Sequence, residues 1–283
     1  MRGTADRTLG RLIENFLSKE PPADLLSGVI TPFTNHFILG FLGLPEQHEE
    51  TVTHWLSIMS RDERMRNLSP LARVASELVR DISWTSSHPG VLARLAGQFP
   101  EADDTRRSEI KSSILMLIIA GIDTTRDSMS LATLTLLREP EQFDSIKSGK
   151  IEASVATEEL LRYNTVSHTG LARRATEDVH IAGRTIRKGD TVLISLASAN
   201  WDERKFSHPK ELNFRRDSSG HIAFGHGIHH CIGHALARAA MSLYLKHLAE
   251  KFPKISLACA EDELSFVFGQ HTYGVEEIPV CWD

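Results

Sequence analysis

Apolar residues recur at helical spacing along the first half of the chain and predict a series of helices. Over residues 8–18 they fall three or four apart, which is the pattern of an amphipathic helix, and a Pro-Pro pair ends it. Asp24 is a candidate N-cap for a second helix over residues 25–43, which Pro32 must kink or interrupt. Apolar positions almost encircle this helix, so it should be deeply buried. Further helices are expected over residues 47–59, 70–84, 141–146 and 152–163.

The longest predicted helix covers residues 106–138 and would extend roughly 50 Å at about 1.5 Å per residue. In its middle, the small residues Ala120 and Gly121 interrupt an otherwise apolar face, and the polar residues Asp123 and Thr124 come soon after. Glycine costs about 1 kcal/mol relative to alanine inside a helix, so a compensating role is expected. A groove opened beside a ligand would supply one.

Beyond residue 164 the pattern changes to short runs rich in β-branched residues, separated by glycines and polar turns. These runs predict a small antiparallel sheet with strands at residues 171–175, 179–181, 184–186 and 191–195. The irregular stretch that follows, residues 199–220, is unusually long for a loop inside a compact domain. Two strand-like runs, at residues 255–258 and 264–268, flank a turn near the end of the chain.

The predicted fold is therefore mainly α with small antiparallel β-sheets. We expect one continuous domain over residues 1–283, because no internal repeat, low-complexity tract or long linker divides the chain. Its parts would be a helical region (1–165), a β-rich and irregular region (166–223), and a cysteine loop with its helix and C-terminal strands (224–283).

The most distinctive stretch surrounds Cys231, with two glycines before the cysteine and one after it. Glycine has no Cβ, so the backbone here can turn tightly and pass close to something flat. Behind the cysteine, apolar residues at helical spacing predict that it lies at the start of an amphipathic helix; they are Ile232, Leu236, Ala239 and Leu243. Unpaired N–H groups and the helix dipole at such an end favour a thiolate, the form of sulfur that binds metals.

Two other interpretations of this cysteine remain open from the residues alone. An isolated cysteine before an apolar helix is usually a small buried hydrophobic residue. Zinc is the second, because histidines crowd around the cysteine at positions 226, 229, 230 and 234. Structural zinc sites, however, usually bring two ligand pairs, and Cys259 and Cys281 do not form a second pair by spacing.

The spacing Phe-Gly-x-Gly-x-His-x-Cys-x-Gly-x-x-Leu-Ala, from Phe224 to Ala237, resembles the haem-binding loop of the cytochrome P-450 family at every fixed position. The resemblance implies haem b, with Cys231 as the axial thiolate ligand of the iron. It also implies that His229 meets a haem propionate and that Phe224 packs beside the sulfur. The glycines of the loop, Gly225 and Gly233 among them, would border the macrocycle.

The long helix carries a second motif of the same family. Its middle resembles the oxygen-activating segment Ala-Gly-x-Asp/Glu-Thr-Thr. By this resemblance, Ala120 and Gly121 would leave room for dioxygen, while Asp123 and Thr124 would relay the protons that oxygen activation consumes in a dry pocket. The alternative is that the polar side chains are solvated or bond back to the helix.

Three further likenesses follow in the family's order. Glu159 and Arg162 resemble its Glu-x-x-Arg motif, a buried structural pair, although exposed pairs at this spacing are common. Arg173 matches its propionate-binding arginine, and the alternative is a solvated residue at a strand edge. The positions where the family lines its substrate pocket fall on Val166, Ser167, His271 and Thr272.

Composition and charge limit the binding partners and the cellular compartment that we expect for the chain. The chain is 41% hydrophobic, and 32 basic residues against 37 acidic ones give a net charge of −5, so neither a nucleic-acid footprint nor a polybasic membrane patch is indicated. Three cysteines far apart suggest a reducing compartment rather than a disulfide framework. The longest apolar run, residues 114–122, is too short to span a bilayer. We expect a cytoplasmic protein of the soluble bacterial type.

The similarity runs from about residue 12 to the C-terminus, whereas the family's full-length members begin earlier and roof the haem with segments that have no counterpart here. Three functions are therefore considered. The first is a monooxygenase that takes electrons from a ferredoxin-type partner and inserts one atom of dioxygen into a small, mostly apolar molecule. The second is a haem protein that does not oxygenate, or that needs a partner chain to complete its fold. The third is a haem-free fragment with an interaction role.

Overall fold

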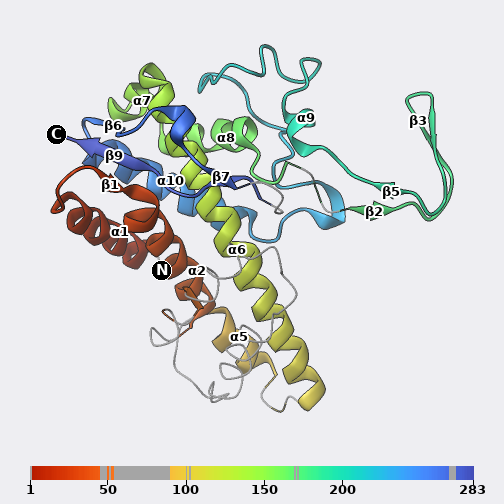
Figure 1. Ribbon diagram of the computed structural model, residues 1–283. Helices are drawn as coiled ribbons and strands as arrows, with labels where there is room; N and C mark the ends of the chain where they lie inside the picture. The colour runs from red at the N-terminus through yellow and green to blue at the C-terminus, as the bar shows by residue number, and fades with distance from the viewer. Residues whose placement is uncertain are drawn as a thin grey trace. The chain divides into compact units, whose positions relative to one another are not determined.

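The computed structural model describes residues 2–44, 50, 52–53, 90–99, 101, 103–168, 170, 172–267 and 272–283 (Figure 1). The helix predicted over residues 70–84 lies outside these residues, as does that predicted over residues 47–59 apart from residues 50, 52 and 53, which are helical. The chain divides into two compact units, one formed by Met1–Lys19 and Ser27–Arg126, the other by Glu20–Leu26 and Asp127–Asp283. Each unit is described by itself below. The single haem-binding domain stays a prediction.

The first unit begins with two helices that bury apolar faces against each other. Helix α1 (Arg2–Leu17) covers the stripe predicted over residues 8–18 and contacts α2 (Thr31–Leu42). A π-helical turn, η1 (Leu26–Ile30), leads directly into α2, and Pro32 is the second residue of α2. Residues 25–42 are helical without a break, so the helix predicted over residues 25–43 is present, and a π-helical turn just before Pro32 takes the place of an interruption. The short helix α5 (Val91–Gln98) also contacts α2.

Helix α6 (Asp104–Arg138) agrees with the predicted long helix to within two residues at its start. Its N-terminal half buries one stripe at four-residue spacing: Ile110, Ile114, Ile118 and Ile122. Gly121 approaches α2 closely, because a Cβ atom built on it would lie 3.3 Å from Cγ2 of Ile38. Close helix packing is thus a structural reason for glycine at this position, independent of any ligand.

The second unit is built around α8 (Ala153–Asn164) packed against α10 (His234–Lys251) (Figure 1), with α7 (Pro140–Lys147) also on α10. The apolar stripe predicted for α10 is wrong in register. Ile232 is 88% exposed and precedes the helix, and the buried positions are Ala240, Met241, Tyr244, Leu245, His247, Leu248 and Ala249. The first apolar residues after Cys231 belong to the loop rather than to the helix, which explains the error. A short helix, α9 (Leu196–Asn200), was not predicted.

The strands that the structure describes in the second unit form four small antiparallel groups. The largest has the order β1 (Ala23–Asp24), β9 (Pro279–Trp282), β6 (Ile255–Leu257). Asp24 caps the helical segment that begins at Leu25, as predicted, because its Oδ1 accepts a hydrogen bond from the amide of Leu26 (3.0 Å). The same oxygen accepts from the amide of Ile278 (2.7 Å), which fastens β1 to the segment before β9.

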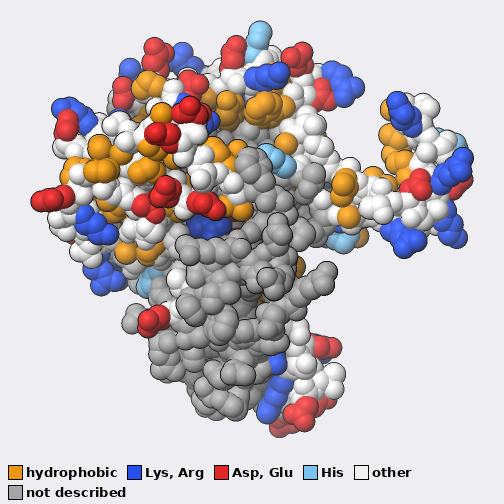
Figure 2. Space-filling view, in the orientation of Figure 1, with side chains coloured by type: hydrophobic (Ala, Val, Ile, Leu, Met, Phe, Trp, Pro, Cys, Tyr) orange, Lys and Arg blue, Asp and Glu red, His pale blue; other side chains and the backbone are white. Residues whose placement is uncertain are grey.

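The sheet predicted over residues 171–195 is two separate ladders, β2 (Arg173–Arg174) with β5 (Thr191–Val192), and β3 (Val179–Ile181) with β4 (Arg184–Ile186). The β3–β4 hairpin is exposed except at Ile186, which is half-buried, and hydrophobic side chains gather on its surface beside basic ones (Figure 2). The last ladder joins β7 (Phe266–Val267) to β8 (Gly274–Val275).

The predicted fold class, mainly α with small antiparallel sheets, is confirmed. The described residues also include two short 3-10 turns, η3 (Gly227–His229) in the cysteine loop and η4 (Glu261–Glu263) after β6. Of the helices that the structure describes, none is long and apolar enough to cross a bilayer.

Candidate haem-thiolate site

The loop that carries Cys231 is shaped by backbone hydrogen bonds and two left-handed glycines. Gly225 and Gly227 have φ angles of 73° and 70°, a conformation that side chains other than glycine rarely adopt. The amide of Cys231 donates to the Phe224 carbonyl (2.9 Å), and the amide of His234 donates to the Cys231 carbonyl (3.3 Å). The loop thus closes on itself just before α10 begins, and Cys231 is exposed at its tip.

The surface of this loop is unusually apolar for an exposed segment. Ile228 is 97% exposed and Ile232 is 88% exposed, and they flank the thiol in the sequence. A Cβ atom built on Gly233 would lie 3.8 Å from the Cys231 sulfur, so the backbone beside the thiol carries no bulk. A flat, mainly apolar group with a metal ion at its centre fits these residues, because it would cover both isoleucines while the sulfur reached the metal. The residues present therefore fit a haem.

The cysteine is not the buried hydrophobic residue considered above, since its side chain is exposed. Zinc finds no support either. In the part of the chain that the structure describes, which includes all of the cysteine loop, no three His, Cys, Asp or Glu side chains are grouped so as to hold a metal ion.

Phe224 lies among basic side chains. Its ring centroid is 4.6 Å from the guanidinium carbon of Arg238, and the rings of His221, His230 and His234 lie 6.2–6.4 Å away. His229 is exposed on the η3 turn, where its side chain is accessible to a carboxylate.

Glu159 and Arg162 form a buried ion pair on α8. Their side chains are 1% and 0% exposed, and Nε and Nη2 of Arg162 each lie 2.8 Å from a Glu159 oxygen. The remaining nitrogen, Nη1, donates to the carbonyls of Asn200 (2.8 Å) and Pro209 (3.0 Å). Burial alone would raise the pKa of Glu159, but hydrogen bonds from Arg162 and Ser218 lower it below its usual value.

Sequence reasoning missed the other partners of Glu159. Arg216 donates from Nε to Glu159 (3.1 Å), the Ser218 hydroxyl donates at 2.6 Å, and the amide of Asn213 donates at 3.2 Å. Arg216 also donates to the carbonyls of Ser207, His208 (3.0 Å) and Glu211 (3.1 Å). One carboxylate therefore organises the irregular segment before the cysteine loop. The only signal in the sequence was the length of that segment, whose carbonyls need donors.

The residues predicted for oxygen activation lie on α6 in the first unit. The Thr124 hydroxyl donates to the Ala120 carbonyl (2.7 Å), and Asp123 lies 3.1 Å from Nη1 of Arg126. Both contacts are within one helix, so the back-bonded arrangement considered as the alternative is the one observed for Thr124. The Arg126 partner was not predicted.

The predicted pocket residues of the second unit come from two segments that the fold joins. Val166 is buried and Ser167 is half-buried, as is Thr272. The amide of Tyr273 donates to the Val166 carbonyl (3.1 Å), which brings the two segments together. The Tyr273 ring also lies 4.9 Å from that of His168. His271 lies outside the described residues.

Arg173 is half-buried in β2, and its Nη1 donates to the Ala172 carbonyl at 3.4 Å. At that distance the bond is weak.

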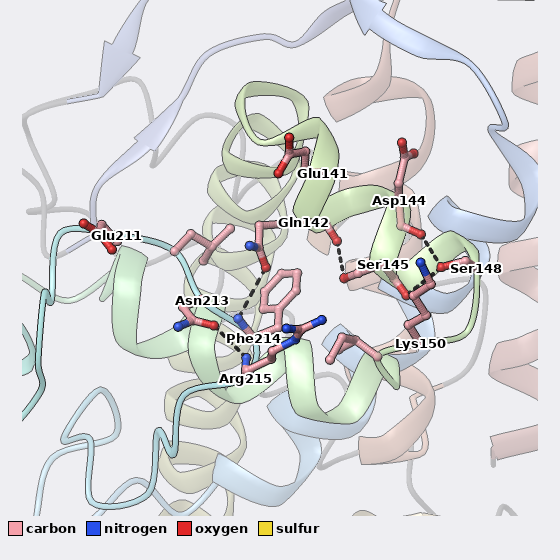
Figure 3. A pocket seen from close by; sticks show the side chains of 12 residues that line it. Glu141, Gln142, Asp144, Ser145, Ser148, Lys150, Glu211, Asn213, Phe214 and Arg215 are labelled. Atoms are coloured by element: carbon pink, nitrogen blue, oxygen red, sulfur yellow. Dashed lines mark hydrogen bonds between the residues drawn. The ribbon is translucent and has the colours of Figure 1, made fainter.

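A separate cleft of about 660 Å³ lies between α7 and the segment 211–215 (Figure 3). Its lining is mostly polar and charged, and the Phe214 amide donates across it to Oε1 of Gln142 (3.4 Å). None of the residues that line it belongs to the predicted haem or substrate sites. We assign it no part in the chemistry.

Comparison with known proteins identifies the family. The family model described as Cytochrome P450 matches residues 154–265, which contain α8 except for its first residue, the Glu159 network and the cysteine loop. The whole chain is 34% identical to cytochrome P-450 SU2 of Streptomyces griseolus and spans 70% of it. It is 33% identical to the pentalenic acid synthase of Streptomyces avermitilis and spans 71% of that protein.

Solved structures agree with these relatives. The mycinamicin VIII C21 methyl hydroxylase of Micromonospora griseorubida, in its crystal structure with mycinamicin VIII, has a TM-score of 0.92 and 31% identity. The match covers 100% of this chain and 73% of that one. The resemblance inferred from the motifs is therefore confirmed. The chain belongs to the cytochrome P-450 family, and shares its haem cofactor and its monooxygenase chemistry.

Proposed function

We propose that the protein inserts one atom of dioxygen into a small, mostly apolar organic molecule, with electrons from a ferredoxin-type donor. The observation that carries the proposal is the exposed thiol of Cys231 between two almost fully exposed isoleucines, on a loop whose glycines leave its backbone bare. Relatives named as a methyl hydroxylase of mycinamicin VIII and as a vitamin D3 dihydroxylase support a hydroxylation.

On the cofactor side, the Cys231 thiolate would bind the haem iron, and the haem, when bound, would supply the redox chemistry of oxygen activation. His229 and Arg173 would bind the propionates, since a guanidinium can grip a carboxylate with two parallel bonds. Phe224 would shield the sulfur from water, and Gly225 and Gly233 would let the loop approach the macrocycle.

On the side of the haem where oxygen would bind, Ala120 and Gly121 would leave space for dioxygen, and Thr124 and Asp123 would relay protons to it. The Thr124 hydroxyl donates its hydrogen bond to the Ala120 carbonyl, so its oxygen can still accept a hydrogen bond from another group. It can take a hydrogen bond from a protonated group while holding a fixed orientation. The Asp123 carboxylate, beside Arg126, would hold and pass on a proton from solvent.

Val166, Ser167, His271 and Thr272 would line the substrate pocket. The three free cysteines fit a reducing compartment, so a cytoplasmic location is part of the proposal, as is a single haem-binding domain over residues 1–283.

The test is a carbon monoxide difference spectrum of the reduced, haem-loaded protein. We expect the red-shifted Soret band of thiolate ligation, and its loss in Cys231→Ala. Cys259→Ala, which removes a partly exposed cysteine elsewhere, should keep the band. A wild-type protein that takes up no haem would overturn the proposal.

The same preparation separates oxygenation from haem binding. Thr124→Ala should keep the spectrum but divert reducing equivalents from product to hydrogen peroxide, because protons would no longer be delivered in order. Unchanged coupling in this variant would contradict the role of Thr124.

A further inference from the structure

Two consecutive glutamates on α8 serve different parts of the second unit. Successive helical residues point about 100° apart, so Glu158 faces away from the Glu159 network. Oε1 of Glu158 accepts from Nε of Arg238 (2.7 Å), and Oε2 accepts from Nη2 of Arg238 (3.0 Å). This is a two-bond ion pair that ties α8 to the second turn of α10, seven residues after Cys231 in the sequence.

His221 completes the group, and its neighbours fix its tautomer. Its Nδ1 lies 3.2 Å from the amide of Ala223, which can only donate, so Nδ1 is an acceptor. The proton is therefore on Nε2, which lies 3.1 Å from Oε2 of Glu158 and donates to it. The His221 side chain is 3% exposed. A neutral, buried histidine thus holds the chain three residues before Phe224.

The contacts continue from this group to the cysteine. The Arg238 guanidinium lies over the Phe224 ring at 4.6 Å, a favourable cation–π distance. The Phe224 carbonyl accepts the amide of Cys231. The position of Phe224 therefore sets the position of the Cys231 backbone, and Glu158 fixes Phe224 from two sides, through His221 before it and Arg238 beside its ring.

We propose that Glu158, through Arg238 and His221, is a positioning group that holds the Phe224–Cys231 segment in the geometry required for axial ligation of the haem iron. This inference rests on the proposed ligand role of Cys231. It assigns Glu158 a task distinct from that of Glu159, which organises residues 200–218 instead. Outer residues that orient a metal ligand typically change metal affinity or activity by 10–100-fold when they are replaced, and we expect the same here.

The charge state of Glu158 agrees with this arrangement. Burial alone would raise its pKa, but hydrogen bonds from His221 and Arg238 lower the pKa to about 2. The carboxylate is therefore ionised at every pH at which the protein would work, and both bonds to Arg238 are charge-assisted.

The test compares Glu158→Gln with Glu250→Gln in the haem-loaded protein. Glu250 is also on the surface of the α8–α10 pair, in an exposed contact with Lys246 on α10 (3.9 Å), so its replacement removes the same charge away from the loop. We expect Glu158→Gln to lose haem to an excess of apomyoglobin about tenfold faster than wild type. The reduced carbon monoxide complex should also convert faster to the form without thiolate ligation. Glu250→Gln should match wild type in both.

A second variant guards against a general loss of stability. Arg238→Lys keeps the positive charge but removes the two-bond geometry and the flat contact with Phe224, so it should behave like Glu158→Gln. If both variants keep wild-type haem loss and a wild-type spectrum, the inference is wrong, whatever their melting temperatures. If wild type itself lacks the thiolate band, it is the proposed ligand role of Cys231 that fails.

Discussion

Two regions of the second unit invert the usual distribution of side chains, in opposite directions. Around Glu159, charged groups are buried: the side chains of Glu159 and Arg162 are no more than 1% exposed. Around Cys231, apolar groups are exposed: Ile228 and Ile232 are at least 88% accessible. The buried charges are satisfied inside the chain, so they rigidify it. The exposed apolar groups remain in contact with water, so they are suited to pack against a ligand that binds from outside the chain.

The difference teaches how the two regions divide the work. A buried ion pair contributes little net stability, but separating its partners lowers the free energy of unfolding strongly. Conformations of the surrounding loop that would break the pair are therefore disfavoured, and one conformation is selected. The Glu159 network holds residues 200–218 in one conformation, and this conformation leads the chain into the cysteine loop. The loop itself leaves Ile228 and Ile232 exposed, as a surface that receives a cofactor requires.

The strongest test of the comparison is Arg162→Leu. This substitution removes the main positive charge beside the buried Glu159 carboxylate, and the remaining hydrogen-bond donors do not compensate for it fully. We therefore expect the free energy of unfolding to fall by about 3–5 kcal/mol. Urea unfolding followed by circular dichroism would measure it. Arg204→Leu is the matched control, because the Arg204 side chain is 90% exposed in its pair with Asp202. A similar, small effect of both substitutions would show that burial does not distinguish the pairs.

A second, intermediate effect concerns pH. The carboxyl pKa of Glu158 falls from an ordinary value of 4.5 to about 2 in the folded protein. A lowered carboxyl pKa contributes stability that is fully present above pH 4.5 and is lost as the pH falls towards 2. The melting temperature of wild type should therefore exceed that of Glu158→Gln at neutral pH, and the gap should close between pH 4.5 and 2. A gap that stays constant over this range would refute the assignment of the carboxylate.

The smallest effect on stability is expected at the exposed isoleucines. Replacing Ile228 and Ile232 by serine should change the free energy of unfolding of the haem-free protein by less than about 0.5 kcal/mol, because both are already in water. Haem affinity should nonetheless fall, as measured by the rate of haem transfer to apomyoglobin. Leu245→Ser, at a fully buried position of α10, is the contrast and should destabilise the haem-free protein by roughly 3 kcal/mol.

Much of the fold could be predicted where one local pattern decides the outcome. Helix α6 has a long continuous apolar periodicity, and its limits were predicted within two residues. Glu159 and Arg162 lie three apart on one helix, so their contact is a local matter. The start of α10 was wrong because Ile232 continues the apolar spacing of the helix while it belongs to the loop.

Long-range partners could not be predicted from pattern. Arg216 meets Glu159 across 57 positions of sequence, and Arg238 meets Glu158 across 80. Nothing in the neighbourhood of either arginine distinguishes it from a solvated one. Likewise, the runs over residues 171–195 looked like one sheet, because alternation predicts strands but does not say which strands pair.

The bond between the Tyr273 amide and the Val166 carbonyl has a practical consequence for changing which substrate the enzyme accepts, if the proposed pocket residues line its substrate site. The two stretches that it joins are distant in the sequence, and both contribute to the proposed pocket. Replacing only one stretch with that of a relative that prefers another substrate would pair its side chains with a stretch from a different protein. Exchanging both stretches together keeps the hydrogen-bonded contact between them, so variant libraries for altered regiochemistry should vary the two stretches together.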